Sequence, residues 1–116
     1  HSNIAIDISA RLDELGRQPY SARDFLIRYQ DRVLFVTDMP VSAAMYRAYF
    51  RFLETKDEFF RVPDYDGTFS RERWRVCGIG LDDSILRKIY YQNALYYIPG
   101  LRSGLAGCIP QDDGED

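Results

Sequence analysis

The chain has 116 residues, of which 46% are hydrophobic and 28% charged, with a net charge of −3 and a pI of about 5.1. This balance is typical of one folded domain with a modest core, and it is not that of a disordered chain. An acidic chain offers no positive field for nucleic acid, and no run approaches the ~20 apolar residues of a membrane-spanning helix. We therefore expect a cytoplasmic protein that binds neither nucleic acid nor membranes.

Cysteine and histidine are too few and too scattered to form a metal site by themselves. Cys77 and Cys108 lie far apart without a CxxC spacing, so two reduced thiols are the expected state and a disulfide is the alternative. The only histidine is His1, whereas a catalytic zinc usually takes three protein ligands. The chain enters a strand-like run soon after His1, with no signal peptide before it, and we expect it to begin within a longer protein.

The first segments predict a strand followed by helices. Isoleucines alternate through NIAIDISA (3–10), which favours a strand. ARLDELG (10–16) predicts one or two helical turns, and Ser21 with Asp24 resembles a capping box that opens the next helix.

A second strand is predicted for the apolar run VLFVT (33–37). The order is then strand, helix, strand, with no tight hairpin turn between the strands. Such a βαβ unit requires parallel strands joined by a right-handed crossover.

The second half of the chain predicts two further helices around an irregular excursion. Ser42 is expected to cap a helix that runs to about Thr55, with one apolar face that serves core packing: Met45, Tyr46, Tyr49, Phe50 and Leu53. Residues 57–80 break the pattern, and the turn signal YDGT predicts a short hairpin or an irregular excursion there. A last helix is expected to begin at Asp82 or Asp83, and Asn93 to cap a further turn.

A carboxylate directly follows the second strand. In parallel α/β folds, catalytic and binding groups gather at the carboxyl ends of the strands, which is where Asp38 lies. The alternative is an N-cap or turn aspartate before Pro40. Asp7 is placed similarly at the end of the first strand, and we interpret it as a buried, hydrogen-bonded acid that holds the Asp-Ile-Ser turn.

Three segments in this order resemble the C-terminal part of the amidohydrolase-related family of metal-dependent hydrolases, in the branch that includes aminocarboxymuconate-semialdehyde decarboxylase. They are YQDRVLFVTDMP (29–40), MYRAYFRFLETKDEFF (45–60) and ILRKIYYQNALYYIPGL (85–101), the last with the Asn-Ala pair of the family's closing helix.

The resemblance implies an α/β fold, namely the last two βα units of a (β/α)8 TIM-type barrel that is incomplete in this chain. The strand at 4–8 would be the seventh of the barrel and the strand at 33–37 the eighth. Residues 1–103 would form this segment, with an insertion at about 57–80, and residues 104–116 a disordered acidic tail.

The resemblance assigns both the catalytic and the metal-binding role to Asp38. In this family the eighth-strand aspartate binds the metal, or takes a proton from the metal-bound water that attacks the substrate. The family's histidine ligands lie on strands that would precede residue 1. We therefore expect a divalent metal, zinc or alternatively manganese, in the complete enzyme, and no tight metal binding by this chain alone. Val36 stands where the family commonly has glycine.

The implied function is hydrolysis of a C–N or C–O bond, or non-oxidative decarboxylation, of a small-molecule substrate. The insertion is expected on the outer wall or at a contact of a homo-oligomer, with Trp74 and the Phe59-Phe60 pair packed there or within one chain. Two alternatives stay open: a non-enzymatic α/β interaction module, and a subunit that completes another chain's barrel. Against the free-standing module, two parallel strands leave both sheet edges unpaired.

Overall fold

The first half of the chain is a βαβ unit. The computed structural model describes residues 3–64, 68–69 and 74–108. Strands β1 (Ile6–Asp7) and β2 (Val33–Leu34) are parallel neighbours, with Ile6 opposite Val33 and Asp7 opposite Leu34. The predicted parallel pairing is confirmed, although the paired part of each strand is shorter than the apolar run around it.

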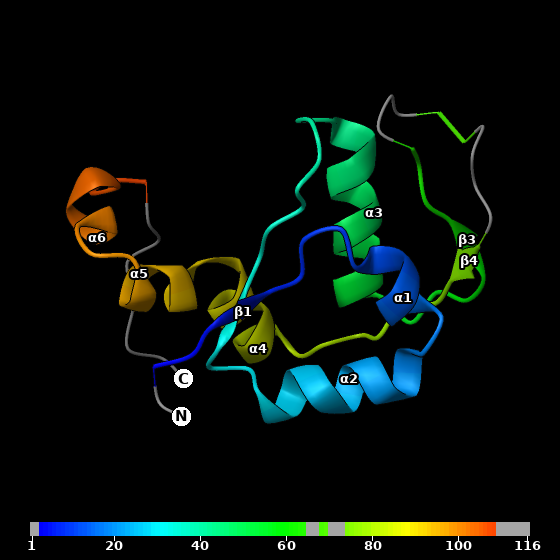
Figure 1. The fold of residues 1–116 in the computed structure, drawn as a ribbon, viewed down its shortest axis with the longest axis horizontal. Coiled ribbons are helices and arrows are strands. Elements are labelled where there is room, and N and C mark those ends of the chain that lie inside the picture. The colour runs from blue at the N-terminus through cyan, green and yellow to red at the C-terminus, as the bar shows by residue number, and fades with distance from the viewer. Residues whose placement is uncertain (1–2, 65–67, 70–73, 109–116) are drawn as a thin grey trace.

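Two helices connect these strands (Figure 1). They are α1 (Leu12–Gly16), as predicted, and α2 (Pro19–Arg28). The predicted capping box at Ser21 is wrong, because α2 already begins at Pro19. The proline ring fixes φ near the helical value and lacks the N–H that the first turn would leave unpaired, so proline suits the first position of a helix.

Helix α3 (Ala43–Glu54) follows β2 and begins where the sequence predicts. Ser42 is its N-cap, and the Ser42 hydroxyl accepts the Met45 N–H at 3.5 Å. The buried face of the helix is slightly rotated from the predicted one and consists of Met45, Ala48, Tyr49, Phe52 and Leu53. Phe50 lies outside this buried face. It is partly exposed, and its ring packs against Phe35, with ring centroids 5.9 Å apart.

The excursion after α3 contains the predicted short hairpin. Strands β3 (Phe60–Arg61) and β4 (Arg75–Val76) are antiparallel, and residues 65–67 of the predicted turn lie outside the described residues. The hairpin packs closely on α1: the Cys77 N–H donates to the Gly16 carbonyl at 2.8 Å, and a Cβ added to Gly16 would come within 2.4 Å of Val76 Cβ. The excursion is thereby attached to the βαβ unit.

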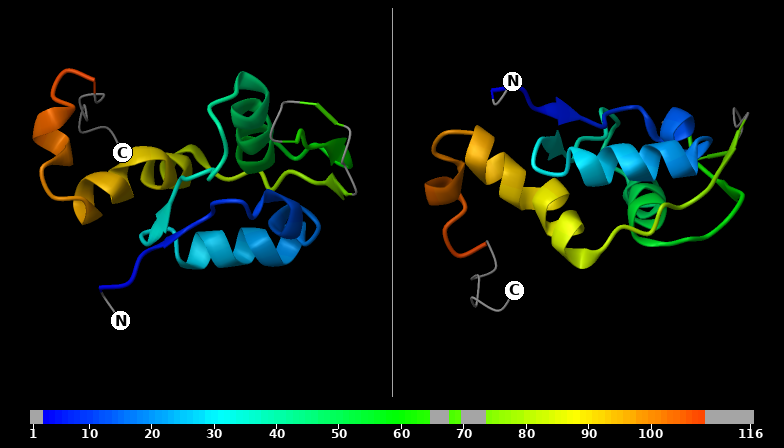
Figure 2. Two further views of the ribbon diagram at one scale, coloured as in Figure 1. Left: turned by 45° about the horizontal axis from the view of Figure 1, so that its top comes forward. Right: turned by 90° about the horizontal axis from the view of Figure 1, so that it is seen from below.

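The C-terminal segment is a helical run with one wide turn, in the order α4 (Asp83–Arg87), η1 (Lys88–Gln92) and α5 (Asn93–Tyr97), followed by α6 (Leu101–Gly104) (Figure 2). Asp82 takes the N-cap position of α4, but its side chain makes no capping bond. The predicted acidic tail begins at the end of α6, and residues 109–116 lie outside the described residues, so its disorder stays a prediction.

The described residues form a mixed α/β fold with two small two-stranded sheets, and they form no closed barrel. One apolar core joins α2, β2, α3 and η1 through Leu26, Val33, Phe52 and Ile89, which are all almost completely buried. Within the described part of the chain, no helix is long and apolar enough to cross a membrane.

Candidate functional site

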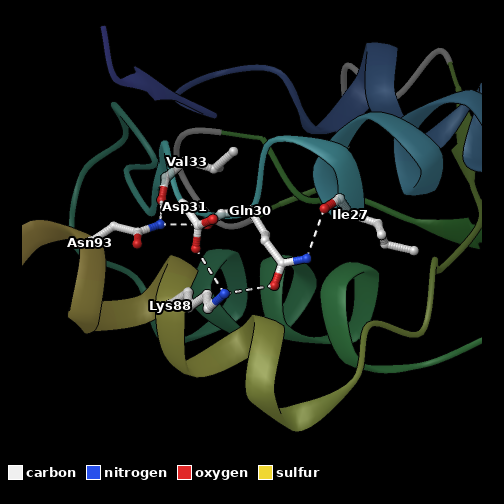
Figure 3. A network of polar contacts seen from close by, with 6 residues as sticks. All are labelled: Ile27, Gln30, Asp31, Val33, Lys88 and Asn93. Carbon is white, nitrogen blue, oxygen red and sulfur yellow. Dashed lines mark hydrogen bonds and ion pairs between the residues drawn. The ribbon is translucent and has the colours of Figure 1, made fainter. Parts of the chain in front are cut away.

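The start of β2 is held in place by the buried side-chain amide of Asn93, from the C-terminal helical run (Figure 3). Asn93 Nδ2 donates to the Val33 carbonyl at 2.8 Å and to the Gln30 carbonyl at 2.6 Å, and the residue is only 6% exposed. The predicted role of Asn93 as a helix cap is wrong. It lies within the continuous helical run, and its side chain connects this run to the strand.

A second, more exposed contact supports the same junction. Lys88 Nζ donates to Gln30 Oε1 at 3.0 Å and forms an ion pair with Asp31 at 2.8 Å, while Gln30 Nε2 donates to the Ile27 carbonyl (Figure 3). Ion pairs this exposed contribute at most about 1 kcal/mol. The buried Asn93 amide is therefore the stronger of the two anchors.

The wide turn η1 covers the outer edge of β2. Its Ile89 carbonyl accepts the Phe35 N–H at 3.1 Å, and the Asn93 N–H bonds five residues back, to Lys88. Wide helical turns of this kind recur at functional sites and leave a carbonyl free for an outside partner. With Val33 and Phe35 both bonded to the helix, the position of β2 is fixed, and with it the position of the residues that follow it.

Asp38 follows β2 on a strained backbone. Its φ is +55°, in the left-handed region that residues other than glycine rarely adopt, although Asp and Asn tolerate it best. Its side chain is exposed and has no hydrogen bond or ion pair among the described residues. The cap of α3 is Ser42, so the N-cap part of the alternative is wrong, whereas a turn aspartate before Pro40 stays an alternative interpretation.

A second strained residue lies at the end of β1, against the same turn. Ala10 has a φ of +53°, and its N–H donates to the Thr37 carbonyl at 3.0 Å. The Tyr49 hydroxyl donates to this carbonyl as well, at 3.5 Å, and the Thr37 hydroxyl accepts the Met39 N–H. The carboxyl ends of the two strands are thus bonded to each other, with Asp38 beside the junction.

Asp7 does not join Asp38. Its carboxylate accepts the N–H and the hydroxyl of Ser9, as the interpretation of the Asp-Ile-Ser turn requires. The hydroxyl hydrogen bond, followed by the N–H bond, lowers the pKa of Asp7. The residue is exposed, so the prediction that it is buried is wrong; β1 lies at the surface with its outer edge uncovered among the described residues.

A cavity of about 190 Å³ opens beside the Asp38 turn. Its lining comes from three places in the chain: Ala10, Leu12 and Asp13 after β1, Met39, Met45 and Tyr49 around the start of α3, and Val62, Pro63 and Asp64 from the excursion. The excursion, which the sequence assigns to the outer wall or to a subunit contact, therefore contributes residues next to the carboxyl ends of the strands.

The two charged residues that line this cavity, Asp13 and Asp64, are both acidic. Partial desolvation raises the pKa of Asp13, and the negative charges of Glu14 and Asp64 raise it further, while Arg17 opposes the shift. Burial raises the pKa of Tyr49 to about 12, with smaller contributions from the charges of Asp13 and Asp38. Tyr49 thus lines the cavity and also lies within the electrostatic reach of Asp38.

The three aromatic residues expected at a subunit contact differ in their exposure and in their contacts. Phe60 is buried in the core, Trp74 stacks under the Arg17 guanidinium at 4.2 Å, and Phe59 is 74% exposed. Phe60 and Trp74 therefore pack within one chain, as the alternative interpretation has it. A homo-oligomer stays a prediction.

The described residues do not supply a complete metal site. Among them, no group of three or more His, Cys, Asp or Glu residues is close enough to hold a metal ion. Asp38 is a single possible ligand, and His1 lies outside the described residues. Cys77 and Cys108 are free thiols rather than a disulfide.

A larger cavity, of about 420 Å³, lies at the other end of α3, between Glu54 and α4. Its Tyr90 hydroxyl donates to Glu54 Oε1 at 2.7 Å, and burial together with this bond raises the pKa of Tyr90. These two polar groups satisfy each other. The arrangement is typical of a structural contact, and we place the candidate site at Asp38.

Comparisons with protein-family models, with curated proteins and with solved structures find no match to this chain. Two features of the site were not predicted from the sequence. They are the strained backbone of Ala10, for which an alanine gives no signal, and the anchoring role of Asn93. The role of Asn93 could have been predicted from its position on an apolar helix face, because a buried amide needs hydrogen-bond partners.

Proposed function

We propose that this chain is the C-terminal part of a metal-dependent enzyme of the amidohydrolase-related family, with Asp38 as its active-site carboxylate. The proposed reaction is hydrolysis of a C–N or C–O bond in a small molecule, with non-oxidative decarboxylation as the alternative. In this proposal β1 and β2 are the last two strands of a (β/α)8 barrel, and the other strands precede residue 1.

The observation that carries the proposal is the state of Asp38. It is an exposed carboxylate without a partner among the described residues, held on left-handed backbone at the carboxyl end of a parallel strand. Such backbone strain costs about 1–3 kcal/mol and clusters at functional sites, where the surrounding structure enforces it. Here the surrounding structure consists of the hydrogen bonds from Asn93 and Ile89 to the β2 segment and the Ala10–Thr37 hydrogen bond.

Asp38 can accept a proton in such a reaction. An exposed carboxylate without a partner can orient a water molecule and take its proton as the water attacks a substrate carbonyl. The parallel β1–β2 pair supports this assignment, because groups at the carboxyl ends of parallel strands face a common binding site.

The described residues alone do not fit a catalytic metal, since no group of three or more His, Cys, Asp or Glu residues among them is close enough to hold one. The proposal therefore assigns the remaining ligands to the preceding part of the protein. It follows that the 116-residue chain should bind zinc or manganese more weakly than about 1 μM, because a catalytic site needs about three protein ligands.

Calorimetric titration tests this assignment. The protein expressed from the gene together with its upstream coding sequence should bind zinc or manganese stoichiometrically, and the 116-residue chain should not. The proposal would be refuted by a tight stoichiometric site in the short chain, or by an extended protein that binds neither metal.

One observation favours a second candidate, the non-enzymatic interaction module. The Ile89 carbonyl and the Asn93 amide already occupy the outer edge of β2, where the first strand of a closed barrel would pair. A barrel therefore requires this edge to open. Scalar coupling across the Phe35–Ile89 hydrogen bond should be present in the short chain and absent in the extended protein; its presence in both favours the module.

A further inference from the structure

The outer edge of β2 is covered by a helix and not by a strand. Leu34 bonds to β1, so the Val33 carbonyl and the Phe35 N–H point to the opposite edge, where another strand could pair. Both groups are bonded instead to the C-terminal helical run of α4, η1 and α5. Asn93 Nδ2 donates to the Val33 carbonyl at 2.8 Å (Figure 3), and the Ile89 carbonyl accepts the Phe35 N–H at 3.1 Å.

These two groups of the helical run take the place of a strand's backbone. Asn93 offers an amide N–H and Ile89 a carbonyl, which are the donor and the acceptor that a pairing strand would present. Four residues of helix rise about 6 Å, close to the roughly 6.6 Å between residues two apart in a strand. The wide turn frees the carbonyl, because the Asn93 N–H bonds to Lys88 and not to Ile89.

The covered segment has the composition of an aggregation-prone strand. VLFVT (33–37) combines high β-propensity and hydrophobicity, and it contains no charge, proline or glycine. An open edge of this kind is a template for pairing with the same segment of another chain, since identical apolar side chains then pack against each other.

The other edge of this sheet differs in composition. Among the described residues the outer edge of β1 is uncovered, but β1 carries the charged side chain of Asp7. A charge on an edge strand disfavours pairing with a second strand. The uncharged β2 segment has no such protection of its own, and its edge is the one that the helical run covers.

We propose that the C-terminal helical run guards the β2 edge, and that the surface beneath it is a self-association site for a second copy of this chain. The occupant is the VLFVT segment of the second copy, paired strand to strand. While Asn93 and Ile89 hold the Val33 carbonyl and the Phe35 N–H, this pairing is blocked. The inference is independent of the proposed function, because it concerns the 116-residue chain without metal or upstream segment.

Sedimentation velocity over a range of chain concentrations tests the guard. Asn93→Ala removes the donor to Val33 and should self-associate at a concentration at least about tenfold lower than the wild type does, the effect of one buried hydrogen bond. Val36→Lys, added to Asn93→Ala, places a charge at a 40% exposed position of the segment. This second change should return association to the wild-type level, because a charge prevents pairing of the segment.

A control separates the open edge from general instability. Gly16→Ala disturbs the contact of the hairpin with α1 and leaves the β2 edge covered. Compared with Asn93→Ala at an equal unfolded fraction, set with urea, it should associate no more than the wild type.

A milder variant covers the case in which Asn93→Ala does not fold. Lys88→Ala keeps the buried amide and removes only the more exposed contact with Gln30 and Asp31. It should fold and show a smaller increase in association, which Val36→Lys should again remove.

Three results would overturn the guard. The first is no added association in Asn93→Ala or, if that variant does not fold, in Lys88→Ala. The second is equal association of Gly16→Ala at the same unfolded fraction. The third is association that Val36→Lys does not reduce.

Discussion

The side-chain amide of Asn93 donates to the backbone carbonyl of Val33 at 2.8 Å, across sixty residues of sequence. The same amide reaches the Gln30 carbonyl, so one buried side chain holds both the turn before β2 and its first residue. Asp38 follows β2 after three further residues. The C-terminal helical run therefore helps to position the candidate catalytic carboxylate.

Asn93→Ala should destabilise the fold by about 2–4 kcal/mol, because it leaves the buried Val33 carbonyl and the partly buried Gln30 carbonyl without this donor. Urea unfolding measures this difference. Gln92→Ala, at the neighbouring and partly exposed position, is the matched control and should change the free energy of unfolding by less than about 0.5 kcal/mol. Similar losses in the two variants would contradict the anchoring role of Asn93.

The strain at Ala10 predicts a gain in stability from a glycine. Ala10→Gly should stabilise the fold by about 1 kcal/mol, because glycine adopts positive φ without steric strain. Ala44→Gly, within α3, should instead destabilise it by about 1 kcal/mol. Thermal unfolding separates the two signs, and a destabilised Ala10→Gly would show that the residue is not strained.

The close contact of the excursion with α1 predicts a sharp difference between two glycines. Gly16→Ala should destabilise the fold by about 1–3 kcal/mol, because the added methyl would overlap the Val76 side chain. Gly104→Ala, in α6, adds a methyl to open space and should be neutral or slightly stabilising. Equal unfolding midpoints for the two variants would mean that the hairpin does not pack on α1.

Part of this fold was predictable because local signals and topology agreed. The strand–helix–strand order requires parallel strands, and Ser42 carries a capping hydroxyl at the helix start that the structure shows. The turn signals around YDGT predicted a short hairpin or an irregular excursion, and the structure shows the hairpin. In each case the determining contacts are short in sequence, or follow from the order of the elements.

The remaining features of the fold and of the site depend on local geometry or tertiary contacts that the sequence pattern does not indicate. α2 begins at Pro19 rather than after Ser21, since the proline geometry prevails over a side-chain cap. Asn93 looked like a cap because its true partners lie sixty residues away. The position of Asp38 was predictable from the strand end, but its left-handed backbone and the excursion beside it were not.

Tyr49 predicts a loss of stability at alkaline pH. Burial raises its pKa in the folded protein from 10.0 to about 12. Below pH 10 the tyrosine is protonated in both states; as the pH rises from 10 to 12 only the unfolded chain ionises. Its contribution to stability therefore falls by about 1.4 kcal/mol per pH unit across this window.

Urea unfolding at several pH values from 9 to 12 measures this slope, and the difference between the wild type and Tyr49→Phe isolates Tyr49. The variant should lose less stability than the wild type over the window. Tyr96→Phe, at an exposed position, should behave as the wild type does. Parallel curves for the wild type and Tyr49→Phe would contradict the assignment.

The most direct test of Asp38 as the active-site carboxylate is the turnover of Asp38→Asn, in the protein expressed with its upstream coding sequence and loaded with zinc or manganese. Turnover is decisive because both roles considered for Asp38, metal ligand and proton acceptor, require its carboxylate. The substrates are a panel of aryl amides, lactones and aryl carboxylic acids, and Asp7→Asn is the matched control. We predict a loss of at least about 100-fold in Asp38→Asn and little change in Asp7→Asn; wild-type turnover in Asp38→Asn would contradict the account.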